Sequence, residues 1–207
     1  MNATLNIGQM VGDFCVEELV KASDENGGET YFVSGREGKK ALMKLYAVET
    51  KAHTVECGSA ALLPQHLGFV PVVANGTIEH NGSSYQYIVR DYVEAKHLSD
   101  LIDEGKLYSW EQATPIVLQV LVALKHLHSQ EPTIIHNDIT ARNILIKEEG
   151  ENVRVYIIGM GHLSHRCNGR ASFCTKELNN WYRAPETFKG IYDEQSDIFS
   201  VGALLHT

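Results

Sequence analysis

A histidine, an aspartate and an asparagine stand at fixed offsets between two apolar runs near the middle of the chain. They are His136, Asp138 and Asn143, within residues 134–146. A carboxylate can accept the proton of an attacking hydroxyl, and an amide oxygen is a neutral ligand for a hard cation such as Mg²⁺. The pattern therefore predicts a strand–loop–strand unit, which either carries a phosphoryl-transfer site or is a turn that these side chains merely cap.

A lysine interrupts an apolar stretch earlier in the chain. Lys44 lies in the predicted strand 40–46, where a buried charge is costly unless an anion pairs with it. The candidate partner is Glu56, in the helix-compatible segment 50–63. The alternatives are that Lys44 belongs to an edge strand and that Glu56 is a solvated helix residue.

These spacings resemble the protein kinase superfamily. The resemblance implies that Asp138 is the catalytic base, that Asn143 binds magnesium, and that Lys44 holds the ATP phosphates and pairs with Glu56. Residues 181–186 and 196–202 resemble the end of the activation segment and the start of the central helix of the large lobe; small-molecule kinases lack both segments. In the family Asp197 receives backbone N–H groups of the catalytic loop, and the simpler alternative is a helix N-cap at Ser196 and Asp197.

One departure from the family concerns the metal. After a predicted strand at 153–158, Gly159-Met160-Gly161 stands where kinases have Asp-Phe-Gly, so the carboxylate that would bridge magnesium to the β- and γ-phosphates is missing. Phosphotransfer is expected to be weak or lost. Asn143 can still hold one ion and the triphosphate can chelate another, which leaves nucleotide binding or weak turnover open. Asn137 replaces the loop arginine, so docking of a phosphorylated activation segment onto that position is not expected.

The predicted nucleotide cleft has further irregularities. Gly27 and Gly28 are the available glycines for a phosphate-binding hairpin, but G-x-G-x-x-G is absent and an ordinary turn is the alternative. Backbone groups of the stretch from Asp91 to Val93 would bind adenine, as the resemblance implies. Arg90 would face the back of this pocket and compete for Glu56, unless the strand register is shifted by one and turns it to solvent.

The resemblance implies an α+β, bilobal fold, with a β-rich N-lobe at 1–93 and a mainly helical, partial C-lobe at 94–207 that carries the catalytic loop and the activation segment. Local patterns agree with it: a hairpin spans 14–33, Asn81-Gly82 predicts a type I′ hairpin turn, and apolar spacing predicts a core helix over 109–130. Ser109 and Gln112 form its candidate capping box, and His128 near its end is expected to pack rather than ligate. A truncated chain with a further C-terminal region is expected, and a minimal fold closed by a partner is the alternative.

Composition excludes several classes of function. A net charge of −8 over 207 residues gives no basic surface for nucleic acid, and no apolar run is long enough to span a membrane. Unpaired cysteine spacing predicts free thiols and a cytoplasmic location. His162, His165, Cys167 and Cys174 match no tight zinc motif, so an ordinary polar loop is expected there.

The sequence as a whole predicts a kinase-like domain with an ATP-type cleft, implied ATP and magnesium, and a regulatory pseudokinase role towards a protein partner. The alternative is an active protein kinase, a transferase that moves the ATP γ-phosphate to a protein hydroxyl with Asp138 as base.

Overall fold

The computed structural model describes residues 3–22, 28–48, 65–150, 152–166 and 180–207. Contacts divide the chain into two compact units. The first comprises Met1–Leu63 and Pro71–Tyr92, and the second comprises Pro64–Val70 and Val93–Thr207. Residues 64–70 join the second unit because the Ile157 amide donates to the Gly68 carbonyl (2.8 Å) and Phe69 forms a parallel bridge with Ile157.

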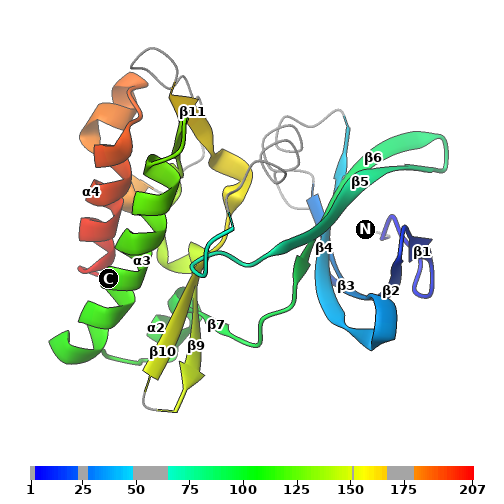
Figure 1. The fold of residues 1–207 in the computed structure, drawn as a ribbon, viewed down its shortest axis with the longest axis horizontal. Helices are drawn as coiled ribbons and strands as arrows, with labels where there is room; N and C mark the ends of the chain where they lie inside the picture. Colours follow the sequence, from blue (N-terminus) through cyan, green and yellow to red (C-terminus); the bar gives the residue numbers. More distant parts are fainter. Residues whose placement is uncertain (1–2, 23–27, 49–64, 151, 167–179) are drawn as a thin grey trace. The chain divides into compact units, whose positions relative to one another are not determined.

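The first unit is built on an antiparallel sheet in the order β1-β2-β3-β4-β6-β5 (Figure 1). The predicted hairpin at 14–33 forms, and so does the Asn81-Gly82 hairpin, whose turn residues both have positive φ (51° and 79°), as a type I′ turn requires. The strands are β1 (Met10–Val11), β2 (Phe14–Lys21), β3 (Gly28–Ser34), β4 (Lys40–Ala47), β5 (Val72–His80) and β6 (Ser83–Asp91), with a 3-10 turn at Arg36–Gly38.

The two faces of this sheet differ. Met43 and Leu45 of β4 point into a buried cluster that also contains Tyr31 and Val89, and Leu5 of the N-terminal segment packs into the same cluster. Side chains alternate along a strand, so Lys44 and its neighbours at 42 and 46 occupy the opposite face. The N-terminal segment therefore covers the face away from Lys44.

The second unit contains three α-helices, as far as the structure describes it: α2 (Leu98–Asp103), α3 (Trp110–His128) and α4 (Glu194–Leu204). Helices α3 and α4 lie side by side (Figure 1). One small sheet has the order β10-β9-β7, and β11 pairs with β8. These strands are β7 (Lys96–His97), β8 (Thr133–Ile135), β9 (Ile144–Glu149), β10 (Asn152–Ile157) and β11 (Ser164–Arg166), and 3-10 turns occupy Ala141–Asn143, Met160–His162, Asn180–Tyr182 and Pro185–Lys189.

The ends of the two long helices follow from capping chemistry. The Ser109 amide donates to Gln112 Oε1 (3.0 Å), which confirms the predicted capping box of α3. Helix α4 begins earlier than the sequence predicted, because Asp193 is its N-cap and accepts the amides of Gln195 and Ser196. The N-cap alternative for Asp197 is therefore wrong, and its carboxylate is available for another role.

Among the residues that the structure describes, no helix has both the length and the apolar character needed to cross a membrane.

Candidate active site

One buried carboxylate, that of Asp197, holds the loop that carries Asp138. Asp197, only 1% exposed, accepts the amides of His136 and Asn137, each at 2.8 Å. His128 Nε2 lies 2.8 Å from the same carboxylate, so this histidine, which was predicted to pack, also hydrogen-bonds to Asp197. Since β8 ends just before this loop and β9 begins just after it, the predicted strand–loop–strand unit is confirmed.

His136 is buried and bonded at both ring nitrogens. Its Nδ1 accepts the Asp138 amide (3.2 Å), so its Nε2 carries the hydrogen and donates to the Ile158 carbonyl (3.1 Å). Burial lowers the pKa of His136, against the opposing effect of the Asp197 and Asp138 carboxylates. The neutral ring thus links the loop to the segment that leads into Gly159.

Asp138 and Asn143 meet directly. The Asn143 amide nitrogen donates to the Asp138 backbone carbonyl (2.8 Å) and to its carboxylate oxygen Oδ2 (2.6 Å). This amide group also fills the space beside Gly159, which has φ +81°: a Cβ at position 159 would lie 2.4 Å from Asn143 Oδ1 and 2.5 Å from its Cγ. A side chain at 159 and Asn143 in this rotamer therefore exclude each other.

Asn137 makes a link that the sequence did not predict. Its backbone has φ +67°, a conformation that asparagine tolerates better than most residues. Its side-chain nitrogen donates to the His162 carbonyl and to the Ser164 hydroxyl, both at 2.8 Å. The residue that replaces the family's arginine thus ties the loop to the start of β11, and the only sequence signal for this was the substitution itself.

The donors near Asp138 do not match a two-ion magnesium site. Asp138 and Asn143 supply oxygens, but position 159 supplies none, and no group of three or more His, Cys, Asp or Glu side chains in the described ranges could hold a metal ion. Among the described residues, Asn143 stays the predicted ligand of a single ion. Cys167 and Cys174 of the set that resembles a zinc site lie outside the described residues.

Lys44 belongs to an interior strand. Strand β4 pairs with β3 on one side and β6 on the other, so the edge-strand alternative is wrong. Lys44 lies opposite Ile88, and Leu42 lies opposite Arg90, which puts Arg90 on the same face as Lys44. The register that would turn Arg90 away is not the one observed. Glu56, the expected partner, lies outside the described residues.

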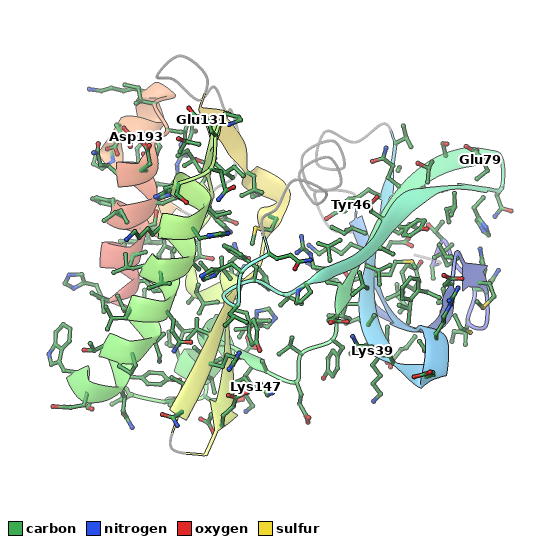
Figure 2. All side chains as sticks on the ribbon, viewed as in Figure 1. Lys39, Tyr46, Glu79, Glu131, Lys147 and Asp193 are labelled. Atoms are coloured by element: carbon green, nitrogen blue, oxygen red, sulfur yellow. The ribbon has the colours of Figure 1, made fainter. Side chains whose placement is uncertain are left out.

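Gly28 has a packing reason to be glycine. A Cβ there would lie 2.4 Å from Cε1 of the Tyr46 ring (Tyr46 is labelled in Figure 2). The ring of Tyr46, on the neighbouring strand, therefore fits only because position 28 has no side chain. Gly27 lies outside the described residues. The sequence considered Gly28 for a phosphate loop, and this close contact accounts for it without any ligand.

In the stretch predicted to bind adenine, some backbone groups already make hydrogen bonds within the first unit. The Asp91 amide donates to the Pro71 carbonyl (3.0 Å), and the Asp91 carboxylate forms an ion pair with Lys39 (2.7 Å). No backbone hydrogen bond of Val93 occurs within the described part of the chain. The amides of Asp91 and Tyr92 are thus already bonded, to the Pro71 and Lys40 carbonyls, and the contact of Val93 with adenine stays a prediction.

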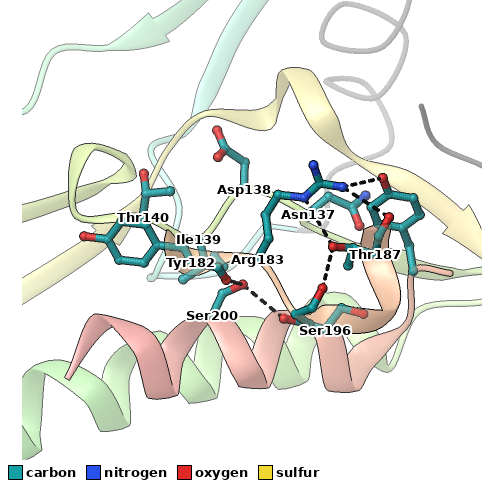
Figure 3. A pocket seen from close by; sticks show the side chains of 11 residues that line it. Asn137, Asp138, Ile139, Thr140, Tyr182, Arg183, Thr187, Ser196 and Ser200 are labelled. Atoms are coloured by element: carbon teal, nitrogen blue, oxygen red, sulfur yellow. Dashed lines mark hydrogen bonds between the residues drawn. The ribbon is translucent and has the colours of Figure 1, made fainter. Parts of the chain in front are cut away.

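A pocket of the second unit adjoins Asp138 (Figure 3). Thr140 of the same loop lines it too, and its other walls come from the segment after Asn180, with Tyr182 and Arg183, and from α4, with Ser200. Most of these side chains are polar. The pocket therefore offers hydrogen-bonding groups beside the predicted base.

Comparisons with known proteins agree with the sequence motifs. Residues 63–207 match the family model of the protein kinase domain. The probable serine/threonine-protein kinase zyg-1 of Caenorhabditis briggsae is 25% identical over 181 residues, covering 87% of this chain and 25% of that protein. Calcium-dependent protein kinase 5 of Plasmodium falciparum is 26% identical over 174 residues, 84% of this chain and 30% of that protein.

A bacterial relative, the probable serine/threonine-protein kinase CPE1738 of Clostridium perfringens, is 34% identical over 122 residues, 58% of this chain and 17% of that protein. The chain thus spans less than a third of the length of each of these three relatives.

Proposed function

Because the chain belongs to the protein kinase domain family, with its β-rich N-lobe and kinase-like fold, we propose that it is a pseudokinase: a nucleotide-binding regulatory domain whose phosphotransfer is weak or lost. The observation that carries the proposal is the contact between Gly159 and Asn143. The position that would present a metal-binding carboxylate has no side chain, and the neighbouring amide occupies its space. Losing even one transition-state donor typically costs about 10²–10³ in rate.

Several residues support nucleotide binding. Lys44 lies in an interior strand on the face away from the N-terminal segment, where it would hold the α- and β-phosphates. Val93 would offer its backbone groups to adenine. Arg90, on the face of Lys44, adds a second positive charge that would attract phosphate oxygens or bind the carboxylate intended for Lys44.

On the acceptor side, the residues hold the base in place without completing the metal site. Asp197 and His136 fix the loop, and Asp138 would take the proton of an acceptor hydroxyl. A bound magnesium–ATP complex would supply the γ-phosphoryl group, with Asn143 as the protein ligand of one ion. The Asn143 amide oxygen would bind that ion, while its amide nitrogen can keep its bond to the Asp138 carboxylate.

The second candidate is an active protein kinase, and a specific observation favours it. Asp138 is retained, its loop is anchored by Asp197 as the family requires, and Asp138 is one of the residues that line the pocket. In this alternative the triphosphate itself chelates the second ion, and Asp138 serves as base at a reduced rate.

We propose a protein as the regulated partner, and the cytoplasm as its place of action, on the basis of the kinase family and the unpaired cysteine spacing. The relatives are protein kinases by name, which supports a protein, and not a small metabolite, as the partner of this domain. Most of each relative lies outside the matched part, so the activity of the whole protein is part of the proposal.

Two assays on the purified chain test the proposal. Millimolar ATP is expected to raise the melting temperature, because a ligand of the folded state stabilises it by RT ln(1 + [L]/Kd). Transfer of labelled phosphate to a generic protein substrate is expected to stay within about tenfold of the Asp138→Asn variant. Turnover in the range of ordinary kinases, roughly 1–100 s⁻¹, that collapses in Asp138→Asn would establish the active kinase instead. No stabilisation by ATP would remove the nucleotide premise.

A further inference from the structure

Helix α3 exposes large aliphatic side chains on the side opposite to its core. Ile116, Val120 and Leu124 are among its residues buried in the second unit. Leu118 and Val122 lie four residues apart, which puts them on one face of the helix, and each is 55% exposed. Single exposed apolar residues are common on protein surfaces, but neighbouring ones on one face indicate a surface that another molecule covers.

Charged residues close this face at both ends. Glu111 and Lys125 are exposed and lie seven residues before and after Leu118, which is about two helical turns. Pro115 is also exposed and lies between Glu111 and Leu118 on the same side of the helix. We call this set the α3 stripe: Glu111, Pro115, Leu118, Val122 and Lys125. Along the helix axis the stripe is first acidic, then apolar, then basic.

The two charges of the α3 stripe have no opposite charge beside them in the described part of the chain. No ion pair among the described residues involves Glu111 or Lys125. The Ser109 side chain hydrogen-bonds to Glu111 and lowers the pKa of its carboxyl, so Glu111 is ionised at neutral pH. An acidic first turn and a basic last turn also suit the dipole of a single helix. The dipole does not account for the exposed aliphatic residues between them.

The α3 stripe is complementary to its own reverse. Positions 111 and 125 are equally far from Leu118 along the helix, so a two-fold axis at Leu118 exchanges them. Two copies of α3 that pack antiparallel about this axis therefore place Glu111 of each copy opposite Lys125 of the other and bring the aliphatic centres into contact. The N-terminal end of each helix dipole then meets the C-terminal end of the other. A two-fold interface requires such a patch, one that fits itself.

We propose that the α3 stripe is a homodimer interface, in which two copies of this chain pack α3 against α3, antiparallel, about Leu118. The order of the charges selects this arrangement, because a parallel pair would put like charges together at both ends. The inference goes beyond the proposed function and requires no nucleotide. The apolar part of the stripe is small, and small interfaces associate weakly, so the dimer is expected only at high protein concentration.

Sedimentation velocity of the purified chain, from micromolar to submillimolar concentration, tests the dimer. The wild type is expected to shift from monomer to dimer as the concentration rises. Leu118→Asp places two carboxylates side by side at the two-fold axis and should weaken association by about 100-fold or more. The matched control is Ile198→Asp, because Ile198 is an exposed aliphatic residue of α4 (46%) outside the stripe. This variant should dimerise like the wild type.

A charge exchange tests the antiparallel arrangement. Glu111→Lys and Lys125→Glu should each weaken the dimer by about tenfold, because each replaces attraction by repulsion at both symmetry-related contacts. The double variant should return to within about threefold of the wild type, since its ion pairs form again in reverse. Both positions are exposed, and melting temperatures check that the variants fold.

The outcomes are distinct. A wild type that stays monomeric at every concentration overturns the proposal. A dimer that Leu118→Asp leaves intact, or that Ile198→Asp weakens to the same extent, also overturns it. A double variant as weak as the single ones contradicts the antiparallel arrangement, and this comparison decides the matter even if Leu118→Asp fails to fold.

Discussion

At the scale of single residues, the contact between Asn143 and Gly159 decides what the site can do. The sequence predicted a missing carboxylate at Gly159, but it gave no sign that the Asn143 amide would turn into the empty space and donate to Asp138. That rotamer depends on the left-handed backbone at 159 and on the loop around it, which are tertiary features. The base is consequently hydrogen-bonded by the very residue that the metal would need.

His136 leads to a prediction for pH. Burial lowers the pKa of His136 in the folded state below its usual value of 6.5. As the pH falls, the unfolded chain therefore binds a proton at this ring before the folded chain does. The stabilising effect of a neutral ring is complete above about pH 6.5 and is lost progressively below it, by up to about 1.4 kcal/mol per pH unit. We expect the free energy of unfolding in urea to fall between pH 7.5 and 5.5.

The variant His136→Gln should show a smaller decrease over the same range, because the titrating ring is gone. The matched control is His206→Gln near the end of the chain, where the histidine is exposed, and it should reproduce the wild-type dependence. An unchanged slope in His136→Gln would contradict the assignment of the pH dependence to this ring.

At the scale of elements, α4 acts as a support for the catalytic loop. Asp197→Ala would leave the His136 and Asn137 amides and the His128 ring without their acceptor, at a cost of about 3–5 kcal/mol. Asp193→Ala on the same helix removes only an N-cap and should cost about 1 kcal/mol. Hydrogen exchange of the α3 amides measures both, and equal effects would show that Asp197 is an ordinary helix residue.

The N-terminal segment is a second supporting element, in the first unit. Leu5 is 2% exposed, and near it Glu29 accepts the Thr4 amide (3.1 Å) and hydroxyl (3.0 Å). The Tyr31 hydroxyl donates to Glu29 and accepts the Leu5 amide; burial, with the Glu29 carboxylate, raises the pKa of Tyr31. These bonds fasten residues 4–5 onto the sheet.

Leu5→Ala should therefore destabilise the first unit by about 2–5 kcal/mol, the usual range for a leucine removed from a core. Ile7, two residues on and 76% exposed, supplies the control: Ile7→Ala should stay within about 0.5 kcal/mol. Exchange rates of the β3 and β4 amides report on this unit. If both variants behave alike, the segment does not belong to the core.

Local rules predicted much of the element structure. The Asn-Gly turn, the capped helix α3 and the apolar strands around Asp138 each follow from a few neighbouring residues. The sequence could not predict Leu5 filling the sheet core or Asn137 bonding to Ser164, because these contacts join segments that are distant along the chain. The start of α4 does have a local signal in the sequence, because Asp193 stands three residues before Ser196 and caps the helix.

At the scale of the whole molecule, the predicted function depends on residues of both units. Lys44 and Arg90 belong to the first, while Asp138, Asn143 and Gly159 belong to the second. The family match covers residues 63–207 and therefore nearly all of the second unit, whereas much of the first lies outside it. The nucleotide side of the proposal therefore depends in part on Lys44, which lies outside the family match.

The dependence of ATP-induced stabilisation on magnesium, compared between the wild type and Gly159→Asp, tests the central claim most directly. The control is Gly190→Asp, another glycine with positive φ (75°), where an added Cβ would have nothing within 4 Å, so that this variant reveals the cost of backbone strain alone. In the wild type, magnesium should increase the ATP-induced rise in melting temperature only slightly, because Asn143 is the one protein ligand proposed for an ion. In Gly159→Asp, Asn143 must move aside and the new carboxylate should make the shift larger with magnesium. A wild-type shift that already grows with magnesium as much as that of Gly159→Asp would contradict the account.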